Sequence, residues 1–138
     1  MDIRYPAVLE PQEGSGFFVR FVDLEGALTD GETLDEALFN AGEALSAMLG
    51  WLLDENKPIP APSPAGEGMH LIAPDARTQA ALLIRRARGD RSLADLARAL
   101  ETSWPSAQRL ENPRHSPTLR QLEKAAAALG KRLVLALE

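Results

Sequence analysis

Residues 92–111 read SLADLARALETSWPSAQRLE and decide the fold of the second half of the chain. Ser92 is a favourable helix N-cap, and Asp95 follows it at capping-box spacing. Apolar residues then recur at helical spacing up to Leu100, and Ser103 is a second N-cap shortly after. The pattern predicts two short helices joined by a tight turn. This is a helix-turn-helix arrangement, in which the second helix can enter the major groove of DNA.

The residues after this pair predict a further helix and a terminal strand. Ser116 is a candidate cap, Pro117 a candidate first helical residue, and Gly130 suits the position just past the helix end. Residues 131–137, KRLVLAL, follow as an apolar strand candidate. We hypothesise that this strand pairs or packs across a two-fold axis and gives a homodimer or higher homo-oligomer, as palindromic DNA half-sites require. Packing on helices of the same chain is the alternative.

The same stretch resembles the phage-repressor-like (XRE-type) helix-turn-helix family. Ser103, Arg109 and Glu111 match a pattern in which Ser opens the recognition helix and Arg-x-Glu stands near its end. Glu101 stands where the family prefers glycine, and Trp104-Pro105 replaces the usual polar pair, which leaves base preference open. The candidate DNA-binding residues are Ser103, Trp104, Ser106, Ala107, Gln108, Arg109, Arg114 and His115.

Two of these side chains are suited to reading bases. Gln108 can pair bidentately with adenine, and Arg109 with guanine. Arg114 and His115 lie in the loop before the next helix, where phosphate contacts are expected. The alternative for Arg109 and Glu111 is an internal ion pair that locks the helices together.

Charge is divided unevenly along the 138 residues, whose formal net charge is −5. Residues 1–74 hold three basic and thirteen acidic side chains, while residues 75–138 hold twelve basic and seven acidic ones. The first part therefore carries −10 and the second +5. Such asymmetry indicates two modules with different partners: the basic part can neutralise phosphates, and the acidic part suits a basic protein. A solvated acidic face is the simpler reading of the acidic part.

Composition narrows the possible chemistry. With no Cys and only two His, neither disulfides nor a His-rich metal site is expected, and no cofactor motif is present. No apolar run is long enough to cross a membrane, and the N-terminus lacks the profile of a signal peptide. We therefore expect a cytoplasmic protein that makes no membrane contact.

The first half has the pattern of a small α+β domain. Strands are expected in residues 3–9, 17–21, 26–31 and 69–73, with Pro6 reducing the first to an edge or irregular strand. Thr33 and Glu36 form a capping box that begins a long amphipathic helix. Met48 and Trp51 on this helix are expected to fill the core or a groove rather than bind a cofactor. Residues 54–68 form a proline-rich connector, and the domain boundary is expected after residue 74.

Residues 23–41 carry a second and more specific resemblance, to the HicB-type antitoxins. The positions that fit the family signature are Gly26, Thr29, Gly31, Thr33, Leu34, Glu36, Ala37, Asn40 and Ala41, followed by the segment from Ile59 to Ser63. Glu25 replaces the usual proline, and Ala27 the frequent cysteine. The resemblance implies an α+β protein: a degenerate RNase H-like β-β-β-α-β domain at residues 1–74, then an all-α helix-turn-helix domain at residues 75–138 with a short C-terminal strand.

The HicB resemblance implies a toxin-neutralising function. An antitoxin of this kind would bind a small basic HicA-type mRNA-cleaving toxin through its first domain and repress the shared operon by binding operator DNA through its second. The residues of this chain that are expected to bind the toxin are the acidic side chains Asp23, Glu25, Asp30, Glu32, Asp35 and Glu36. These acids lie in turns and at a helix start, whereas a metal-dependent nuclease needs carboxylates that converge from strand interiors, so no enzyme activity is expected. The alternative is a stand-alone repressor whose first domain senses a small molecule or another protein.

Overall fold

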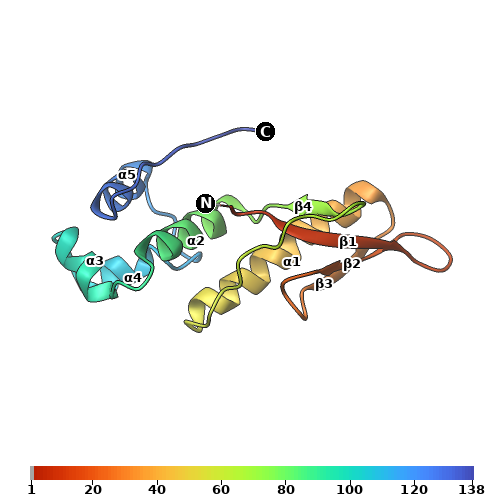
Figure 1. Ribbon diagram of the computed structural model, residues 1–138, viewed down its shortest axis with the longest axis horizontal. Coiled ribbons are helices and arrows are strands. Elements are labelled where there is room, and N and C mark those ends of the chain that lie inside the picture. The colour runs from red at the N-terminus through yellow and green to blue at the C-terminus, as the bar shows by residue number, and fades with distance from the viewer. Residues whose placement is uncertain (1) are drawn as a thin grey trace. The chain divides into compact units, whose positions relative to one another are not determined.

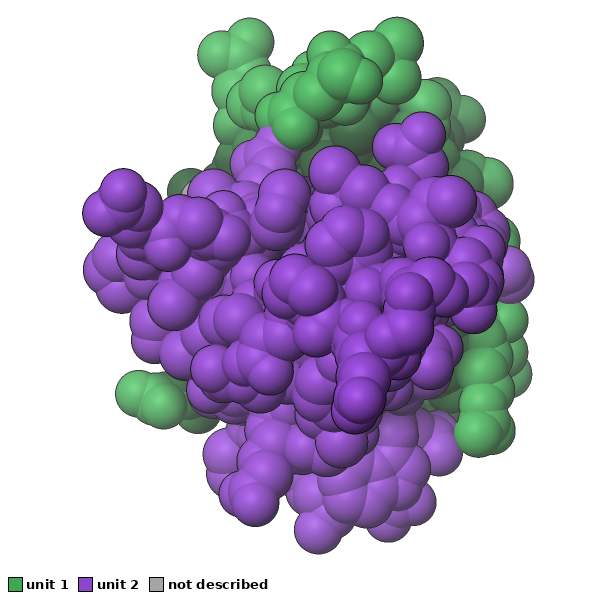
Figure 2. Space-filling model, turned by 90° about the vertical axis from the view of Figure 1, so that its right-hand side faces the viewer, with its two compact units in different colours: residues 1, 80–138 green, residues 2–79 purple. Residues whose placement is uncertain are grey.

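The computed structural model describes residues 2–138, which form a mixed α+β fold. The chain divides into two compact units, coloured separately in Figure 2: Asp2–Gln79, here called the sheet unit, and Ala80–Glu138, here called the helical unit. The boundary falls inside helix α2 (Ala76–Arg88), slightly later than the boundary expected after residue 74. Asp75 begins this helix, because its carboxylate accepts a hydrogen bond of 2.9 Å from Thr78 N.

The sheet unit is built on a four-stranded antiparallel sheet (Figure 1). Its strands are β1 (Tyr5–Pro11), β2 (Phe17–Phe21), β3 (Leu28–Gly31) and β4 (His70–Ile72), in the order β3-β2-β1-β4. The alternation that predicted β2 is confirmed, since Val19 and Phe21 are buried and Arg20 is exposed. Helix α1 (Leu34–Asp54) lies between β3 and β4 in the chain. The predicted order of three strands, one helix and one strand is therefore confirmed.

Pro6 lies in a central strand, not in the edge strand that the sequence predicted. Its carbonyl accepts a hydrogen bond of 3.2 Å from Val22 N, and in an antiparallel ladder the nitrogen of the same residue faces the same neighbour. Because β2 ends at Phe21, the missing N–H points past the end of that strand. The proline is tolerated because the only ladder hydrogen bond that it removes is the one to Val22, at the end of the pairing between β1 and β2.

One face of α1 packs against the sheet, as Figure 1 shows. Thr33 caps the helix as predicted, and its side-chain oxygen accepts a hydrogen bond of 3.1 Å from Glu36 N. The buried residues recur at every fourth position and are Ala37, Ala41, Leu45, Leu49 and Leu53. The buried stripe is narrow, and the apolar side chain of Leu34, at the start of the helix, is exposed.

Gly31 allows the end of β3 to meet the start of α1. A Cβ at this position would lie 2.4 Å from Ala37 N, closer than side-chain carbons approach a backbone atom. Gly31 is itself buried, so the contact cannot open toward solvent. Only glycine fits at this junction without displacing the helix.

The helical unit contains the rest of α2 and three short helices, α3 (Leu93–Ala99), α4 (Trp104–Arg109) and α5 (Leu119–Ala128). The N-caps predicted at Ser92 and Ser103 are confirmed, and Ser92 forms a complete capping box with Asp95. The core of this unit is formed by small and branched apolar side chains: Ile84, Leu96, Ala97, Ala107, Leu122, Ala125 and Leu129.

Helix α5 begins two residues later than the sequence predicted. Thr118, not Ser116, is its N-cap. The Thr118 hydroxyl accepts from Gln121 N at 3.1 Å, and Gln121 Oε1 accepts from Thr118 N at 2.8 Å. This reciprocal capping box satisfies two backbone donors at once, whereas Ser116 is followed three residues later by Leu119, which has no side-chain acceptor to return the hydrogen bond.

The turn between α3 and α4 reverses the chain without a glycine. Thr102 N donates to Ala97 O at 3.0 Å and Glu101 N donates to Arg98 O at 3.1 Å, the hydrogen-bond pattern of a Schellman motif. This motif needs left-handed backbone after the C-cap, and Glu101 has a φ of 54°. The requirement explains why glycine would be favoured at this position.

The predicted C-terminal strand is not formed within the single chain. Residues 131–138 have no strand assignment, and no described strand pairs with them. A strand requires a neighbouring strand to bond its backbone groups, so the apolar pattern alone is not sufficient. Gly130 ends α5 as predicted, with a φ of 71°.

We predict that Glu101→Gly stabilises the helical unit by about 0.5–1 kcal/mol, because it removes the left-handed strain of a residue with a Cβ but adds freedom to the unfolded chain. Urea denaturation should be followed by Trp104 fluorescence in a Trp51→Phe background, so that only the helical unit reports. Glu101→Ala, which keeps the Cβ, is the control and should change stability little. A glycine variant no more stable than the alanine variant would contradict this account.

Candidate functional site

The α3–α4 pair positions most of the residues predicted to bind DNA. Ser103 caps α4: its oxygen accepts from Ser106 N at 3.3 Å and donates to Ser106 Oγ at 3.0 Å. Both hydroxyls therefore organise the first turn of the helix. Pro105 lies in that turn, where its missing N–H costs nothing.

The remaining predicted positions of α4 face different surroundings. Trp104 is 48% exposed, and Gln108 and Arg109 are also exposed. Ala107 is completely buried, and its methyl group belongs to the core of the helical unit. The outward surface of α4 thus presents an indole, an amide and a guanidinium, but not Ala107.

A shallow hollow of about 230 Å³ lies beside α4. Arg109 and Ser106 line one side of it, and His115 lines the other together with the start of α5. The His115 and Arg114 side chains are both exposed in the connecting loop. The structure therefore places Arg109 and His115 around one polar depression, whereas the sequence predicts a base contact for Arg109 and a phosphate contact for His115.

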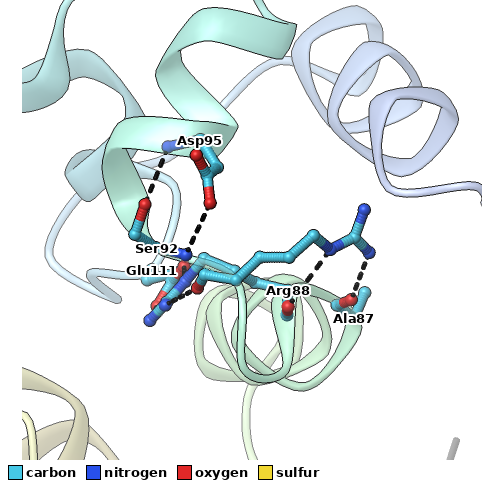
Figure 3. Close-up of polar contacts among 6 residues, drawn as sticks. Ala87, Arg88, Ser92, Asp95 and Glu111 are labelled. Carbon is cyan, nitrogen blue, oxygen red and sulfur yellow. Dashed lines mark hydrogen bonds and ion pairs between the residues drawn. The ribbon is translucent and has the colours of Figure 1, made fainter.

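Glu111 forms a buried ion pair with Arg88 (Figure 3). Arg88 Nε lies 2.6 Å from Glu111 Oε2, and Arg88 Nη2 lies 2.9 Å from Oε1. The side chains are 12% and 7% exposed. The hydrogen bond and charge of Glu111 raise the pKa of Arg88 above its usual value. The internal ion pair considered for Glu111 therefore exists, but its partner is Arg88 and not Arg109.

Arg88 could not be found from local sequence. It lies 23 residues from Glu111, and nothing in the spacing of arginines in the second half marks it out. The one available signal is general: a carboxylate buried in a helical core needs a cation, but this rule does not say which one.

Arg91 and Ser92 fix the turn between α2 and α3, and Figure 3 shows the capping box of Ser92 with Asp95. Arg91 Nη2 donates to Ala87 O at 3.1 Å and to Leu129 O at 3.3 Å, which ties the end of α2 to the end of α5. Hydrogen bonds from Ser92 lower the pKa of Asp95, so this cap is strongest at neutral pH and weakens as acid protonates the carboxylate. Asp95 also pairs with Arg98 on the surface.

The six acidic residues predicted to bind a toxin lie in the sheet unit, but they differ in burial and in hydrogen-bond partners. Asp23 is partly buried, and its carboxylate accepts from Ser63 N at 2.9 Å and from Ser63 Oγ, which holds the proline-rich segment in place. Glu32 accepts from Ser15 Oγ at 2.8 Å on the surface. The remaining four are exposed, mostly around the junction of β3 and α1: Glu25, Asp30, Asp35 and Glu36.

Within residues 2–138, no group of three or more His, Asp or Glu side chains is arranged to hold a metal ion. The carboxylates described above are occupied by caps, by hydrogen bonds to serine side chains or by solvent. The site chemistry that these residues offer is binding through exposed charge and apolar surface. In the same part of the chain, no helix has the length and apolar character needed to span a bilayer.

Comparison with known proteins gives a consistent set of relatives. Residues 4–79 match the model of a family described as HicB-like antitoxin of bacterial toxin–antitoxin system. Antitoxin HicB of Escherichia coli strain K12 is 34% identical over 135 residues, which cover 96% of this chain and 98% of that protein. Antitoxin HicB 1 of Photorhabdus laumondii is 31% identical over 137 residues, covering 99% and 88%. The similarity thus extends through both units.

We predict that Glu111→Ala lowers the free energy of unfolding of the helical unit by about 3 kcal/mol, because the Arg88 guanidinium stays buried without its carboxylate. The measurement is urea denaturation followed by Trp104 fluorescence with Trp51 replaced by Phe. Glu123→Ala removes an exposed acid from α5 and should change stability by no more than about 0.5 kcal/mol. Equal losses in the two variants would mean that the ion pair is not a stabilising contact.

Proposed function

The chain belongs to the HicB-like family of antitoxins of bacterial toxin–antitoxin systems, and we propose that it neutralises a small basic mRNA-cleaving toxin of the HicA type and represses the shared operon. The sheet unit would bind the toxin and the helical unit would bind operator DNA. The observation that carries the proposal is the family relationship over nearly the whole chain, joined to opposite charges in its two parts.

The proposed toxin-binding role rests on the acidic surface of the sheet unit. Residues 1–74 carry a formal charge of −10, and exposed acids follow one another from Asp30 to Glu36. Such a field attracts a basic partner and raises its association rate. Under this proposal the unit is a degenerate RNase H-like domain that acts by occluding the toxin, without catalysis of its own, and Asp23 contributes by holding the segment around Ser63.

The proposed DNA-binding role rests on the α3–α4 pair, which we interpret as a helix-turn-helix with α4 as the recognition helix. Trp104, Gln108 and Arg109 point outward from α4, and residues 75–138 carry a charge of +5. Gln108 and Arg109 would contact base edges. Arg114 and His115, with the capping hydroxyls of Ser103 and Ser106, would contact phosphates.

We further propose that the helical units of two chains associate. A hollow of about 410 Å³ lies between α2, α5 and the C-terminal segment, and it is lined by apolar side chains such as Leu83 and Leu122. Val134, which lines the hollow, is largely exposed, as are Leu135 and Leu137 farther along the segment, the last of them completely. A second copy would cover these side chains and present two recognition helices to a palindromic operator.

Co-expression with the small open reading frame beside this gene tests the toxin-binding role. We expect a basic protein of under about a hundred residues to copurify with the full chain, and to arrest growth when expressed without it. A neighbour that is neither toxic nor bound would contradict toxin neutralisation. That result, combined with operator binding, would favour a stand-alone repressor whose sheet unit senses another ligand.

We predict that Arg109→Ala weakens binding to the DNA upstream of the operon by about 5- to 150-fold, the equivalent of 1–3 kcal/mol for one base contact. Fluorescence anisotropy at fixed salt measures the dissociation constant. Arg77→Ala removes the same charge from an exposed position of the sheet unit, and it should have little effect. Equal weakening by the two variants would show that Arg109 contributes only general charge.

A further inference from the structure

An apolar groove of about 330 Å³ runs along one side of α1 in the sheet unit. The segment from Gly26 to Leu28 forms one wall, and small side chains of α1, Ala44 and Ala47, form the floor with Met48. Trp51 closes one end. All these residues belong to the sheet unit, so the groove is a feature of that unit alone.

The large side chains of the groove are exposed to solvent. Trp51 is 51% exposed and Leu28 is 55% exposed, although both are among the most apolar side chains of the unit. Trp51 lies outside the buried stripe of α1, which runs from Ala37 to Leu53, and the side chain of Leu28 is exposed at the first residue of β3. An exposed tryptophan beside a hollow with a floor of small residues has the composition of a binding hot spot.

Lys57 holds the indole of Trp51 in a defined position. Its ammonium nitrogen lies 5.2 Å from the centre of the ring, within cation–π range. The backbone of Lys57 is held at the helix end, since its N–H donates to Leu52 O at 2.9 Å. A pre-ordered aromatic side chain loses little freedom on binding, which favours its use as an anchor.

Three exposed acidic side chains flank the groove and outnumber the cation Lys57. Glu25 precedes its first residue, Glu43 lies one helical turn before Ala47, and Glu55 lies one turn after Trp51; all three are exposed. A partner with a basic surface and a protruding apolar side chain complements this arrangement. A second copy of the chain does not, because it would bring the same acids against each other.

We propose that this groove is the anchor site for the basic toxin, which inserts an apolar side chain between Leu28 and Trp51 and places cationic side chains against the surrounding acids. This inference rests on the proposed function and adds to it the location of the contact. The toxin-binding surface is then centred on the side of α1 that carries Ala47 and Trp51, and the acids at the start of α1 contribute mainly to attraction at longer range.

The test compares full-length variants for binding to the purified toxin by calorimetry. Trp51→Ala removes the anchor and should weaken binding by at least about 30-fold. Phe39→Ala is the matched control: it removes an aromatic side chain that is 68% exposed on the same helix but does not line the groove. Ala47→Lys places on the floor of the groove a side chain with the same positive charge as the toxin, and it deletes no existing contact. Phe39→Lys is the control for this variant.

The outcomes separate this inference from the proposed function. The groove is supported as the toxin-binding site if Trp51→Ala and Ala47→Lys lose toxin binding while both Phe39 variants bind it nearly as well as wild type. All variants should also show the same melting curve as wild type. If the groove variants bind the toxin as well as the wild-type chain does, the groove is not the toxin-binding site. The proposed antitoxin role would be unaffected by that result. A wild-type chain that binds no toxin would reject the proposed function. A change in the mass of the free chain caused by Trp51→Ala, with toxin affinity unchanged, would assign the groove to a second copy.

Discussion

The buried ion pair of Arg88 and Glu111 is the contact on which the geometry of the helical unit depends. It joins the last turn of α2 to the residues just after α4, and its two hydrogen bonds fix orientation as well as distance. Arg88 also donates to Arg91 O, and Arg91 reaches Leu129 O at the end of α5. Two arginines thus set where three helices begin or end, while the apolar core of small side chains fills the space between them. The exposed surface of α4 is positioned by this polar framework.

Features that depend on neighbouring residues could be predicted from the sequence. The caps at Thr33, Ser92 and Ser103 were found because a hydroxyl three residues before a backbone donor is a local pattern. Features for which the sequence offers two local alternatives could be predicted less well. Ser116 and Thr118 both offered a cap to α5, and the choice was made by Gln121, whose side chain returns the hydrogen bond only to Thr118. The left-handed backbone of Glu101 was indicated in the sequence only by the resemblance to the phage-repressor-like family, which prefers glycine at this position.

The sequence predicted which segments of the chain hold the candidate residues, but it did not predict which of their side chains are exposed. Residues 103–109 lie on a helix as expected, yet the sequence did not show that Ala107 belongs to the core. Asp23 was grouped with surface acids, and only the fold reveals that Ser63, forty residues away, is its partner. The apolar side of α1 that carries Trp51 was seen as core or groove. Its exposure depends on how far the sheet extends beneath the helix, which helical periodicity does not specify.

The proline-rich segment also limits how the sheet unit can associate. Pro58, Pro60, Pro62 and Pro64 occupy every second position, so a β-strand made from this segment would have no N–H groups along one side. Tyr5 Oη donates to Pro60 O at 2.6 Å, and Asp23 accepts the N–H of Ser63, an odd-numbered residue that keeps its donor. The segment therefore carries the chain from α1 to β4 in a form that cannot seed edge-to-edge pairing on its donor-free side. A second chain therefore finds no row of backbone N–H groups to pair with on that side of the segment.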